Sequence, residues 1–361
     1  MKQLQLIVLH LRAMNLSDEL VRWYLKNKRQ LPWRDTTDAY VIWLSEIILQ
    51  QTRVEQGMPY FYRFLEKYPD VRAFAAADED EILKLWQGLG YYSRGRNMLK
   101  TARQVLALYD GKFPEGYSQL IKLKGIGEYT AAAISSFAAN EAKAVVDGNV
   151  YRVLARYFGI EEPINSPKGK KLFQELANEL LNHEHPGLHN QAMMEFGAML
   201  CKPKSPDCGI CPVRQECYAF NNGKISVLPQ KLKTVKVRER FFNYILVVDG
   251  NRVLMNKRDD KDIWANMYDL PLIETNSQLA SADVIMLSHF KDYFGRDARL
   301  VKAFPAKIHM LTHQRIYAQF IQVGGAKIKP APGLFFTEIS NLRSLALPKV
   351  ISIFINDFFD L

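Results

Sequence analysis

The four cysteines of this chain lie in one short stretch, and they constrain its fold more than any other feature. They follow the spacing C-x6-C-x2-C-x5-C within residues 201–217, and the sequence holds no others. Four thiolates in one loop can close around a single metal centre, and both zinc and a [4Fe–4S] cluster accept four cysteines. Disulfide pairing is the alternative, but bridges are rare in a reducing compartment. The spacing therefore predicts a metal or cluster loop and leaves zinc and iron open.

Length and composition indicate two domains in a cytoplasmic protein. The chain has 361 residues, 48% of them hydrophobic, and a net charge of +10, which suits a polyanionic partner without identifying one. The apolar stretch at residues 5–14 is too short to cross a membrane, so no membrane segment is expected. Residues 15–18 resemble a helix entrance, which makes Met14 as well as Met1 a candidate start.

The pattern of apolar and charged residues changes after the cysteines. Up to about residue 220, apolar residues recur at three- and four-residue intervals, which is typical of amphipathic helices. A stretch rich in Lys and Arg follows, and then a strand, an Asp-Gly-Asn turn and a second strand. Another strand pattern spans residues 315–323. The predicted parts are an all-α domain at 1–225, a basic linker at 226–240 and a smaller α+β domain at 241–361.

A glycine-containing hairpin lies at residues 118–137. One helix is expected to end near Leu123, and a second to begin near Glu128, with Gly125 and Gly127 in the tight turn between them. The unpaired N–H groups and the positive dipole end of the second helix would grip a phosphate without reading base sequence. A plain connection between two helices is the alternative.

Three separated motifs together resemble the endonuclease III superfamily of DNA glycosylases. The cysteine spacing matches its iron–sulfur loop, LKGIGEYTA at 123–131 matches its helix-hairpin-helix, and VVDGNVYRVLAR at 145–156 matches the segment with its essential aspartate. The resemblance covers residues from about 16 to 225. It implies an all-α helix-hairpin-helix glycosylase domain, and it favours a [4Fe–4S] cluster over zinc. The implied cluster ligands are Cys201, Cys208, Cys211 and Cys217.

One position separates two chemistries within this superfamily. The lyase members carry a lysine two residues after the second glycine of the hairpin, and its amine forms a Schiff base with the sugar. This chain has Tyr129 there, and a phenol cannot form a Schiff base. Together with WLSEIILQQT at 43–52 and GLGYYSRGRN at 88–97, this resembles the adenine DNA glycosylases of the MutY type. The resemblance implies a monofunctional enzyme that removes adenine mispaired with 8-oxoguanine or guanine in double-stranded DNA.

Glu46 is a carboxylate within an apolar helical pattern. It shares its helix face with Ile42, Trp43 and Leu49, and apolar surroundings raise the pKa of an acid. Such an acid can donate a proton near neutral pH. The resemblance implies that Glu46 protonates N7 of the extruded adenine. A buried ion pair with Arg34 or Arg53 is the alternative.

Asp147 is the second carboxylate in the interpretation. The resemblance implies that its ionised form stabilises the oxocarbenium-like sugar that develops as the base leaves, the two-carboxylate logic of glycoside hydrolysis. The alternative is a helix N-cap, because Gly148-Asn149-Val150 follows and Asp is favoured there. Tyr129 and Asn149 are implied to position water and the sugar.

The resemblance also implies which residues touch DNA. Gln51 would fill the gap left by the extruded base and Tyr91 would wedge beside 8-oxoguanine, while Gln191 could pair with adenine through its amide. Core packing is the alternative for Tyr91, and a solvated helix position is the alternative for Gln191. The full implied set in the first domain is Trp33, Arg34, Leu49, Gln51, Leu89, Tyr91, Gly125, Gly127 and Gln191.

Residues 241–361 resemble, more weakly, the Nudix-like recognition domain that this family appends. The REx2E glutamates of the Nudix box are missing, so no nucleotide hydrolysis is expected. Leu311-Thr312-His313 stands where the family usually shows Phe-Ser-His. Thr312 keeps a hydroxyl that could bond the N7–H side of 8-oxoguanine, whereas Leu311 lacks the ring. An ordinary edge strand is the alternative.

Two other functions compete with the adenine-specific glycosylase. One is a bifunctional glycosylase and lyase acting on oxidised pyrimidines, against which Tyr129 argues. The other is a cluster-containing DNA-binding scaffold without turnover. No feature of the sequence implies an oligomer, so a monomer is expected.

Overall fold

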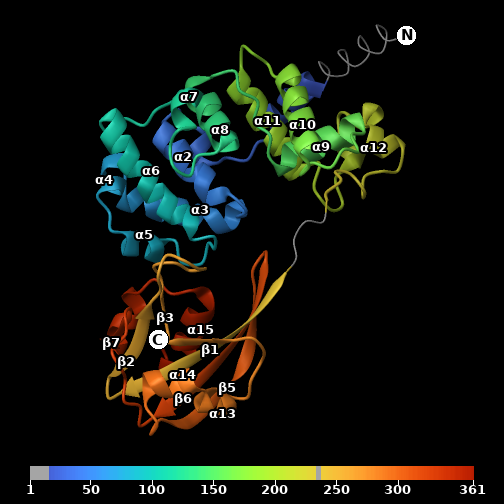
Figure 1. The fold of residues 1–361 in the computed structure, drawn as a ribbon. Coiled ribbons are helices and arrows are strands. Elements are labelled where there is room, and N and C mark those ends of the chain that lie inside the picture. The colour runs from blue at the N-terminus through green and yellow to red at the C-terminus, as the bar shows by residue number, and fades with distance from the viewer. Residues whose placement is uncertain (1–15, 233–236) are drawn as a thin grey trace. The chain divides into compact units, whose positions relative to one another are not determined.

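The computed structural model describes residues 16–232 and 237–361, which divide into two compact units (Figure 1). The first unit comprises residues up to 76 and from 100 to 233, and the second comprises residues 77–99 and 234–361. Helix α6 (Ser93–Tyr109) belongs to both units. The candidate start Met14 lies outside the described residues.

The first unit is helical in the part that the structure describes. It begins with a helical stretch at residues 16–27. Its further elements are η1 Pro32–Arg34, α2 Ala39–Leu49, α3 Val54–Lys67, α4 Val71–Ala75, α7 Tyr117–Leu120, α8 Glu128–Ala139, α9 Gly148–Phe158, α10 Pro167–Leu180, α11 Pro186–Met199, η2 Cys208–Ile210, η3 Arg214–Glu216 and α12 Tyr218–Asn221. The predicted start of the second hairpin helix at Glu128 is confirmed.

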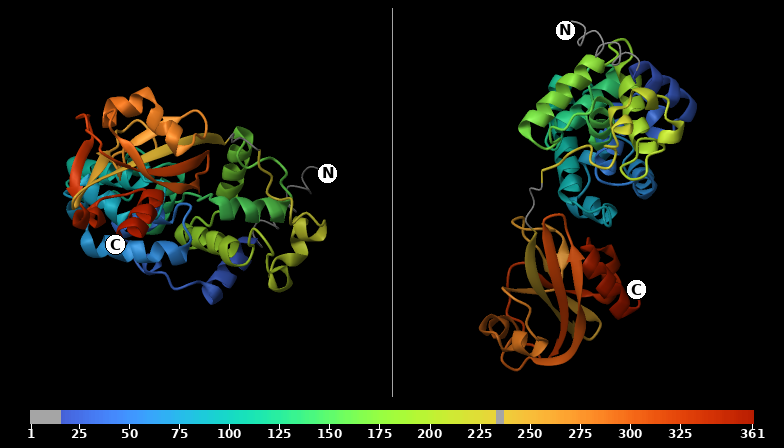
Figure 2. Two further views of the ribbon diagram at one scale, coloured as in Figure 1. Left: turned by 90° about the horizontal axis from the view of Figure 1, so that it is seen from below. Right: turned by 90° about the vertical axis from the view of Figure 1, so that its right-hand side faces the viewer.

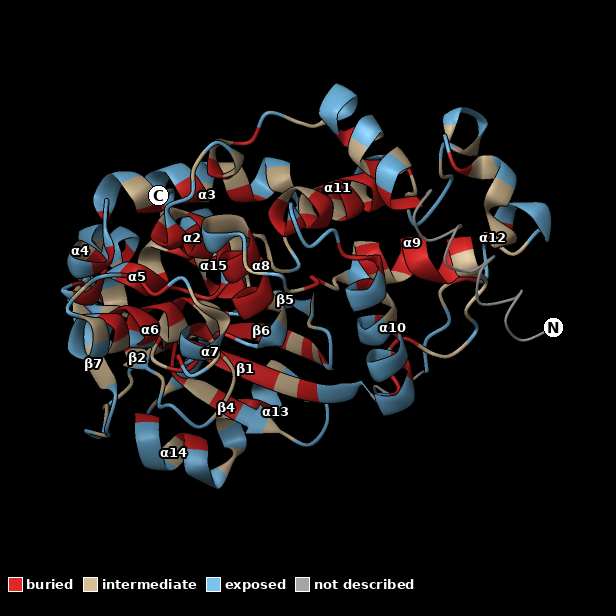
Figure 3. Cartoon of the chain, turned by 90° about the horizontal axis from the view of Figure 1, so that it is seen from above, coloured by how far each residue is buried: buried red, intermediate tan, exposed pale blue. Residues whose placement is uncertain are grey.

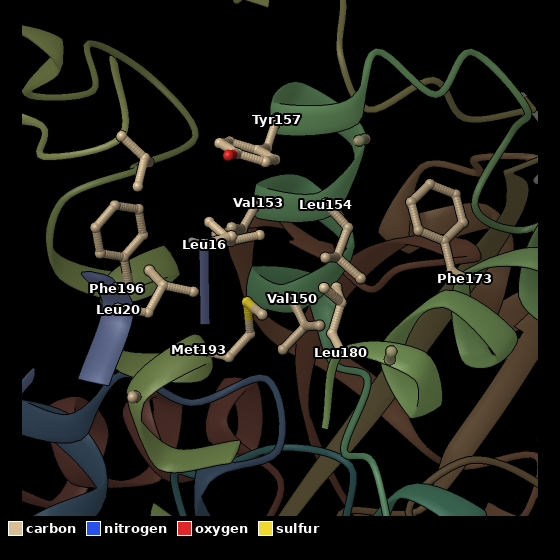
Figure 4. Close-up of a cluster of buried hydrophobic side chains, with 14 of the residues drawn as sticks. Leu16, Leu20, Val150, Val153, Leu154, Tyr157, Phe173, Leu180, Met193 and Phe196 are labelled. Carbon is tan, nitrogen blue, oxygen red and sulfur yellow. The ribbon is translucent and has the colours of Figure 1, made fainter. Parts of the chain in front are cut away.

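Helix α9 runs through an apolar core of this unit. Buried residues extend along both α9 and α11 (Figure 3). The apolar positions of α9 recur at three- and four-residue intervals, so they form one face that packs against other helices. The cluster joins Val150, Val153, Leu154 and Tyr157 of α9 with Leu16, Leu20, Phe173, Leu180, Met193 and Phe196 (Figure 4). This packing fixes α9 and therefore the position of its N-terminus.

Helix α2 is buried along most of its length. The side chain of Asp38 caps its start by accepting a hydrogen bond from the Tyr40 N–H at 2.8 Å. Eight of its eleven residues are buried, so Glu46 stands in a helix that has little contact with solvent. The helix ends at Leu49, where the chain turns sharply into Gln51.

The second unit is α+β, as predicted, and its strands form a mixed sheet. The strands are β1 Arg238–Asp249, β2 Arg252–Lys257, β3 Tyr268–Asp269, β4 Leu272–Thr275, β5 Arg299–Met310, β6 Gln314–Gly324 and β7 Leu334–Glu338. Their order is β3-β2-β1-β6-β5, with β4 on β1 and β7 on β2. Strands β1 and β6 run parallel, with Phe242 opposite Ala318, and the other pairs are antiparallel.

Helices complete this second unit. They are α5 Glu79–Leu85, α13 Ser281–Met286, α14 Ser288–Phe294, η4 Ile339–Ser344 and α15 Lys349–Phe359. Helix α15 covers one face of the sheet (Figure 2). On that face Phe354 stacks on Phe320, with ring centroids 3.8 Å apart. The predicted strand at 315–323 falls within β6.

Strand β1 begins at Arg238, inside the stretch predicted as a linker up to residue 240. Arg240 is buried there, because its guanidinium pairs with Asp262 and Glu274 at 2.6 Å each. The basic composition therefore marks part of a strand as well as a connection. No helix within the described ranges is long and apolar enough to cross a membrane.

We expect Leu154→Ala to lower the free energy of unfolding by about 3 kcal/mol, because Leu154 is fully buried in the α9 core and its truncation leaves a cavity. Leu108→Ala is the matched control, since Leu108 is 65% exposed and its loss should cost less than about 0.5 kcal/mol. Denaturant unfolding followed by the helical circular dichroism signal measures both. Equal midpoints for the two variants would contradict this description of the core.

Candidate active site

A cavity of about 790 Å³ lies in the first unit. Its walls come from η1, α2 and the turn after α2, together with the N-terminal ends of α8 and α9 and part of α11. Its size is in the range of small-molecule sites. Nine of the predicted site residues line it: Trp33, Arg34, Glu46, Leu49, Gln51, Tyr129, Asp147, Asn149 and Gln191.

Glu46 lies in this cavity against Tyr129. The Tyr129 hydroxyl donates a hydrogen bond of 2.8 Å to Oε2 of Glu46. Burial is the largest influence on the pKa of Glu46 and raises it; the hydrogen bond from Tyr129 and the charge of Arg34 lower it, and the charge of Asp147 raises it. Together they bring the pKa to about 7. Glu46 can therefore hold a proton near neutral pH.

The alternative interpretation of Glu46 as a structural ion pair is not what the structure shows. Arg34 pairs with Glu195 at 2.7 Å, and Arg53 is exposed. Among the described residues, neither arginine makes an ion pair with Glu46. The carboxyl group of Glu46 is thus left to the cavity and to Tyr129.

Asp147 is the N-cap of α9, as the alternative interpretation predicted, and it also lines the cavity. One carboxylate oxygen accepts the N–H groups of Asn149 and Val150, each at 2.8 Å, and the other accepts the side-chain amide of Asn149 at 2.6 Å. Burial raises the pKa of Asp147, and these donors and Arg152 oppose the rise. Three N–H donors aimed at one carboxyl group favour its ionised form.

Tyr129 lies in the first turn of α8 and reaches the cavity from the hairpin. Burial and the charge of Glu46 raise the pKa of its phenol well above the usual value. The hydroxyl therefore stays protonated and remains a hydrogen-bond donor. In the hairpin itself, Gly125 adopts a φ of +81°, and Gly127 caps α8 without a side-chain hydrogen bond. Both glycines lie outside the residues that line the cavity.

Gln191 is held by a neighbour rather than solvated. The Tyr24 hydroxyl donates a hydrogen bond of 2.7 Å to its Oε1 atom, which fixes the orientation of the amide at the cavity wall. Trp33 is buried, and its ring contacts the edge of Phe61 at 5.0 Å between centroids. These contacts preorganise the cavity.

Gln51 and Tyr91 share an unusual backbone conformation. Their φ angles are +56° and +47°, in the left-handed region that residues other than glycine rarely adopt. Both residues are exposed, and Tyr91 is 45% exposed, which rules out the core-packing alternative for it. Strained backbone of this kind clusters at functional sites.

A second cavity, of about 510 Å³, lies within the second unit. It brings together Tyr91, Leu311, Thr312 and His313, which the sequence predicted as recognition residues. The hydroxyl groups of Tyr91 and Thr312 share a hydrogen bond. Leu89 lies outside both cavities and is buried.

The four cysteines lie around one small cavity of about 30 Å³, which is otherwise lined mainly by apolar residues and Arg156. None of them forms a disulfide. The guanidinium of Arg156 lies 3.4 Å from Sγ of Cys201, where it can offset thiolate charge. Within the described residues, no group of three or more His, Cys, Asp or Glu converges closely enough to hold one metal ion. The donor set itself, four thiols around one apolar cavity, fits a group held by four cysteines.

Two residues of the cavity were missed by sequence reasoning. Arg29 and Glu195 line it, and Glu195 is 1% exposed. The signal was present, because Glu195 interrupts an apolar helical stretch, as Glu46 does. Its partners could not be found from the sequence, since Arg29 lies 166 residues away.

Comparisons with known proteins agree with this geometry. Residues 44–182 match the HhH-GPD superfamily of base excision DNA repair proteins, and residues 243–357 match the NUDIX domain. An adenine DNA glycosylase of Buchnera aphidicola subsp. Schizaphis graminum is 35% identical over 260 residues, which cover 72% of this chain and 75% of that protein. One from Buchnera aphidicola subsp. Acyrthosiphon pisum is 32% identical over 298 residues, covering 82% and 84%.

The fold comparison points the same way. The solved structure of a thermostable thymine-DNA glycosylase is similar with a TM-score of 0.54 and 29% identity, covering 58% of this chain and 97% of that one. The predicted fold class, a helix-hairpin-helix glycosylase domain followed by a Nudix-like domain, is confirmed. The chain belongs to the adenine DNA glycosylase family.

Proposed function

We propose that this chain removes adenine paired with 8-oxoguanine or guanine from double-stranded DNA and leaves an abasic site, with Glu46 as the acid. The observation that carries the proposal is the pair of carboxyl groups in one cavity with different environments. Burial sets the pKa of Glu46 at about 7, whereas Asp147 accepts three N–H hydrogen bonds. Two acids held in different environments are suited to opposite roles in one reaction.

The proposed reaction follows from these two environments. Protonated Glu46 gives its proton to N7 of the adenine, which makes the base a better leaving group. The bond between N9 and C1′ then breaks, and the electron pair leaves with the base. The sugar develops oxocarbenium character, which the Asp147 carboxylate stabilises by its charge. A water adds to C1′ and loses a proton, so the products are free adenine and an abasic sugar.

Tyr129 and Asn149 support this step as positioning groups. Tyr129 donates to Glu46 and stays protonated, so it can orient the acid without competing for the transferred proton. Asn149 donates to Asp147 and its backbone N–H does the same, so the two groups hold the carboxylate in place. We place the attacking water and the deoxyribose between these groups.

An adenine inside a duplex must leave the base stack before it can reach Glu46. The cavity of about 790 Å³ would receive the flipped base, with Trp33, Arg34 and Gln191 on its walls. An oriented glutamine amide can pair with the N6 donor and a ring acceptor of adenine. Gln51, exposed at a strained turn directly after α2, would fill the gap in the duplex.

Recognition of the opposite base is proposed for the cavity of the second unit. Thr312 would bond the N7–H side of 8-oxoguanine, and Tyr91 would wedge beside it. The hairpin with Gly125 and Gly127 would hold a phosphate at the N-terminus of α8. The net charge of +10 favours association with DNA generally.

A [4Fe–4S] cluster is proposed at Cys201, Cys208, Cys211 and Cys217. When bound, such a cluster cross-links its loop and can take up or release an electron. Four free thiols also suit a reducing, cytoplasmic location. One chain supplies every residue invoked here, so the proposal needs only a monomer.

The two competing functions fit less well. A lyase needs an amine where Tyr129 stands, and that phenol instead donates to Glu46. A scaffold without turnover gives no reason for two carboxyl groups in different environments within a cavity of this size.

Glu46→Gln should slow adenine release by roughly a hundredfold to ten-thousandfold, because the amide cannot supply the proton. Single-turnover assays on duplexes with adenine opposite 8-oxoguanine measure it, with and without alkali before strand separation. Strand breaks should appear mainly after alkali, and borohydride should trap no adduct. Glu66→Gln, at an exposed position of α3, is the control and should behave as the wild type. Strand breaks without alkali would show lyase activity and contradict a monofunctional glycosylase.

Thr312→Val should reduce the preference for adenine opposite 8-oxoguanine over adenine opposite guanine by roughly fivefold, the effect of one hydrogen bond worth about 1 kcal/mol. The valine keeps the shape of the side chain and loses its hydroxyl. Thr337→Val is the control, because Thr337 lies on β7 and does not line the cavity. If both variants kept the wild-type ratio of rates, Thr312 would have no role in recognition.

Purified protein should be brown and contain about four irons per chain, because the four cysteines would hold a [4Fe–4S] cluster. Iron and zinc analysis, together with the visible absorption spectrum, measures this. Colourless protein that contains zinc would contradict the cluster.

A further inference from the structure

We propose that Glu195 is a positioning residue that clamps Arg29 and Arg34 to the active-site wall and neutralises their charge beside Glu46. The inference rests on the proposed role of Glu46 as an acid. It concerns a residue that touches neither base nor sugar in that role and that acts only through the two arginines.

The geometry of the clamp is unusually complete. Arg29 donates to Glu195 from Nε at 2.9 Å and from Nη2 at 2.6 Å, and its backbone N–H adds a third bond at 3.0 Å. Arg34 donates from Nη1 at 3.0 Å and from Nη2 at 2.7 Å. Both oxygens of one carboxylate therefore receive two guanidinium forks, and such forks fix direction as well as distance.

Glu195 is a buried anion that needs these partners. Its side chain is 1% exposed on α11, whereas the side chains of Arg34 and Arg29 are 12% and 27% exposed. An isolated carboxylate would be costly at such a position. Hydrogen bonds from both arginines and the charge of Arg34 overcome this penalty and hold the pKa of Glu195 at about 2, so it is ionised at neutral pH.

The clamp lies in the same cavity as the acid. Arg29, Arg34, Glu46 and Glu195 all line it, and the charge of Arg34 reaches Glu46 strongly enough to lower the pKa of that acid. The ionisable groups on the cavity walls, from every contributing element, are Arg29, Arg34, Glu46, Arg53, Glu55, Tyr129, Asp147, Tyr151, Arg152 and Glu195. Of these, Glu195 pairs directly with Arg34, at the end of η1, and with Arg29, which precedes η1.

Removing the charge of Glu195 would leave two guanidinium groups without their anion. Uncompensated positive charge favours the ionised form of a neighbouring carboxyl group. Glu46 would then lose its proton at a lower pH, and less of it could act as an acid at neutral pH. The clamp therefore allows Arg29 and Arg34 to line the cavity without driving Glu46 into its ionised form.

A second contact extends the positioning role. The guanidinium of Arg34 lies over the ring of Tyr24 at 5.6 Å, and the Tyr24 hydroxyl donates to Gln191. Loss of the clamp would therefore also loosen the wall proposed to meet adenine. That loss is independent of pH, so it can be separated from the electrostatic effect.

The test is the pH dependence of single-turnover adenine release between about pH 5 and about pH 9. For the wild type, the rate should fall as the pH rises through about 7, because Glu46 must be protonated. Glu195→Gln should move this alkaline midpoint toward acid by about one pH unit, which is an additional tenfold loss at about pH 8 that disappears at about pH 5. Glu175→Gln removes the same charge from the exposed face of α10 and should leave the midpoint unchanged.

Two more variants keep the proposal testable if Glu195→Gln fails to fold. Arg29→Gln removes one cation and leaves Glu195 paired with Arg34, so its midpoint should move toward higher pH. Glu195→Asp retains the charge, so its midpoint should stay at the wild-type value even if its rate falls at every pH. Circular dichroism checks that each variant is folded.

Each outcome has one meaning. If Glu195→Gln or Arg29→Gln lowers the rate by the same factor at every pH and leaves the midpoint in place, the clamp is only structural and the inference is wrong. A wild-type rate without an alkaline limb would also overturn it. If the wild type releases no adenine at all, the proposed function itself fails.

Discussion

The burial of one carboxyl group in helix α2 is the constraint on which the active site depends. Glu46 faces a cavity from a helix whose neighbours are mostly buried, and its direct hydrogen bond comes from Tyr129. Water cannot solvate its charge well, so the proton is held to about neutral pH. An unpaired cation on another wall of the cavity would lower the pKa of Glu46, so the polar groups there must not include one. The pairing of Arg34 with Glu195 meets that requirement.

The apolar core makes this arrangement possible from a distance. Helix α9 packs along its length against α10, α11 and the first helical stretch, so its N-terminus is held in place. Asp147 is therefore presented to the cavity as the cap of a fixed helix. The same aspartate accepts backbone N–H groups of α9 and lines the cavity, so its role as N-cap and its proposed catalytic role do not exclude each other.

Features set by local chemistry were predictable from the sequence. The hairpin glycines indicated where α8 begins, the Asp-Gly-Asn turn indicated β1 and β2, and an acid in an apolar pattern indicated Glu46. Nine predicted residues line one cavity. Several motifs in the order typical of one family allowed them to be predicted as a set. Pairings between distant segments were not predictable. Arg34 was expected to pair with Glu46 if it paired with an acid, but its partner lies 161 residues away on α11.

The boundary of the linker shows a similar limit. Lys and Arg residues suggested solvent up to residue 240, yet Arg240 is buried in the second unit between two carboxylates. Composition describes the average environment of a segment, whereas a buried ion pair depends on where single partners fall in three dimensions. The same reasoning explains why Glu195 escaped notice although it interrupts its helix as Glu46 does.

The left-handed backbone at Gln51 and at Tyr91 limits which residues can replace each of them. β-Branched residues fit that conformation poorly, so valine, isoleucine and threonine are poor replacements whatever their contacts with DNA would be. Glycine would relax the backbone at both turns but would remove the side chain proposed to contact DNA. Asparagine is the natural compromise, because it tolerates this conformation and still projects a polar group. Few residue types should therefore be tolerated at these two positions, even though both side chains are exposed.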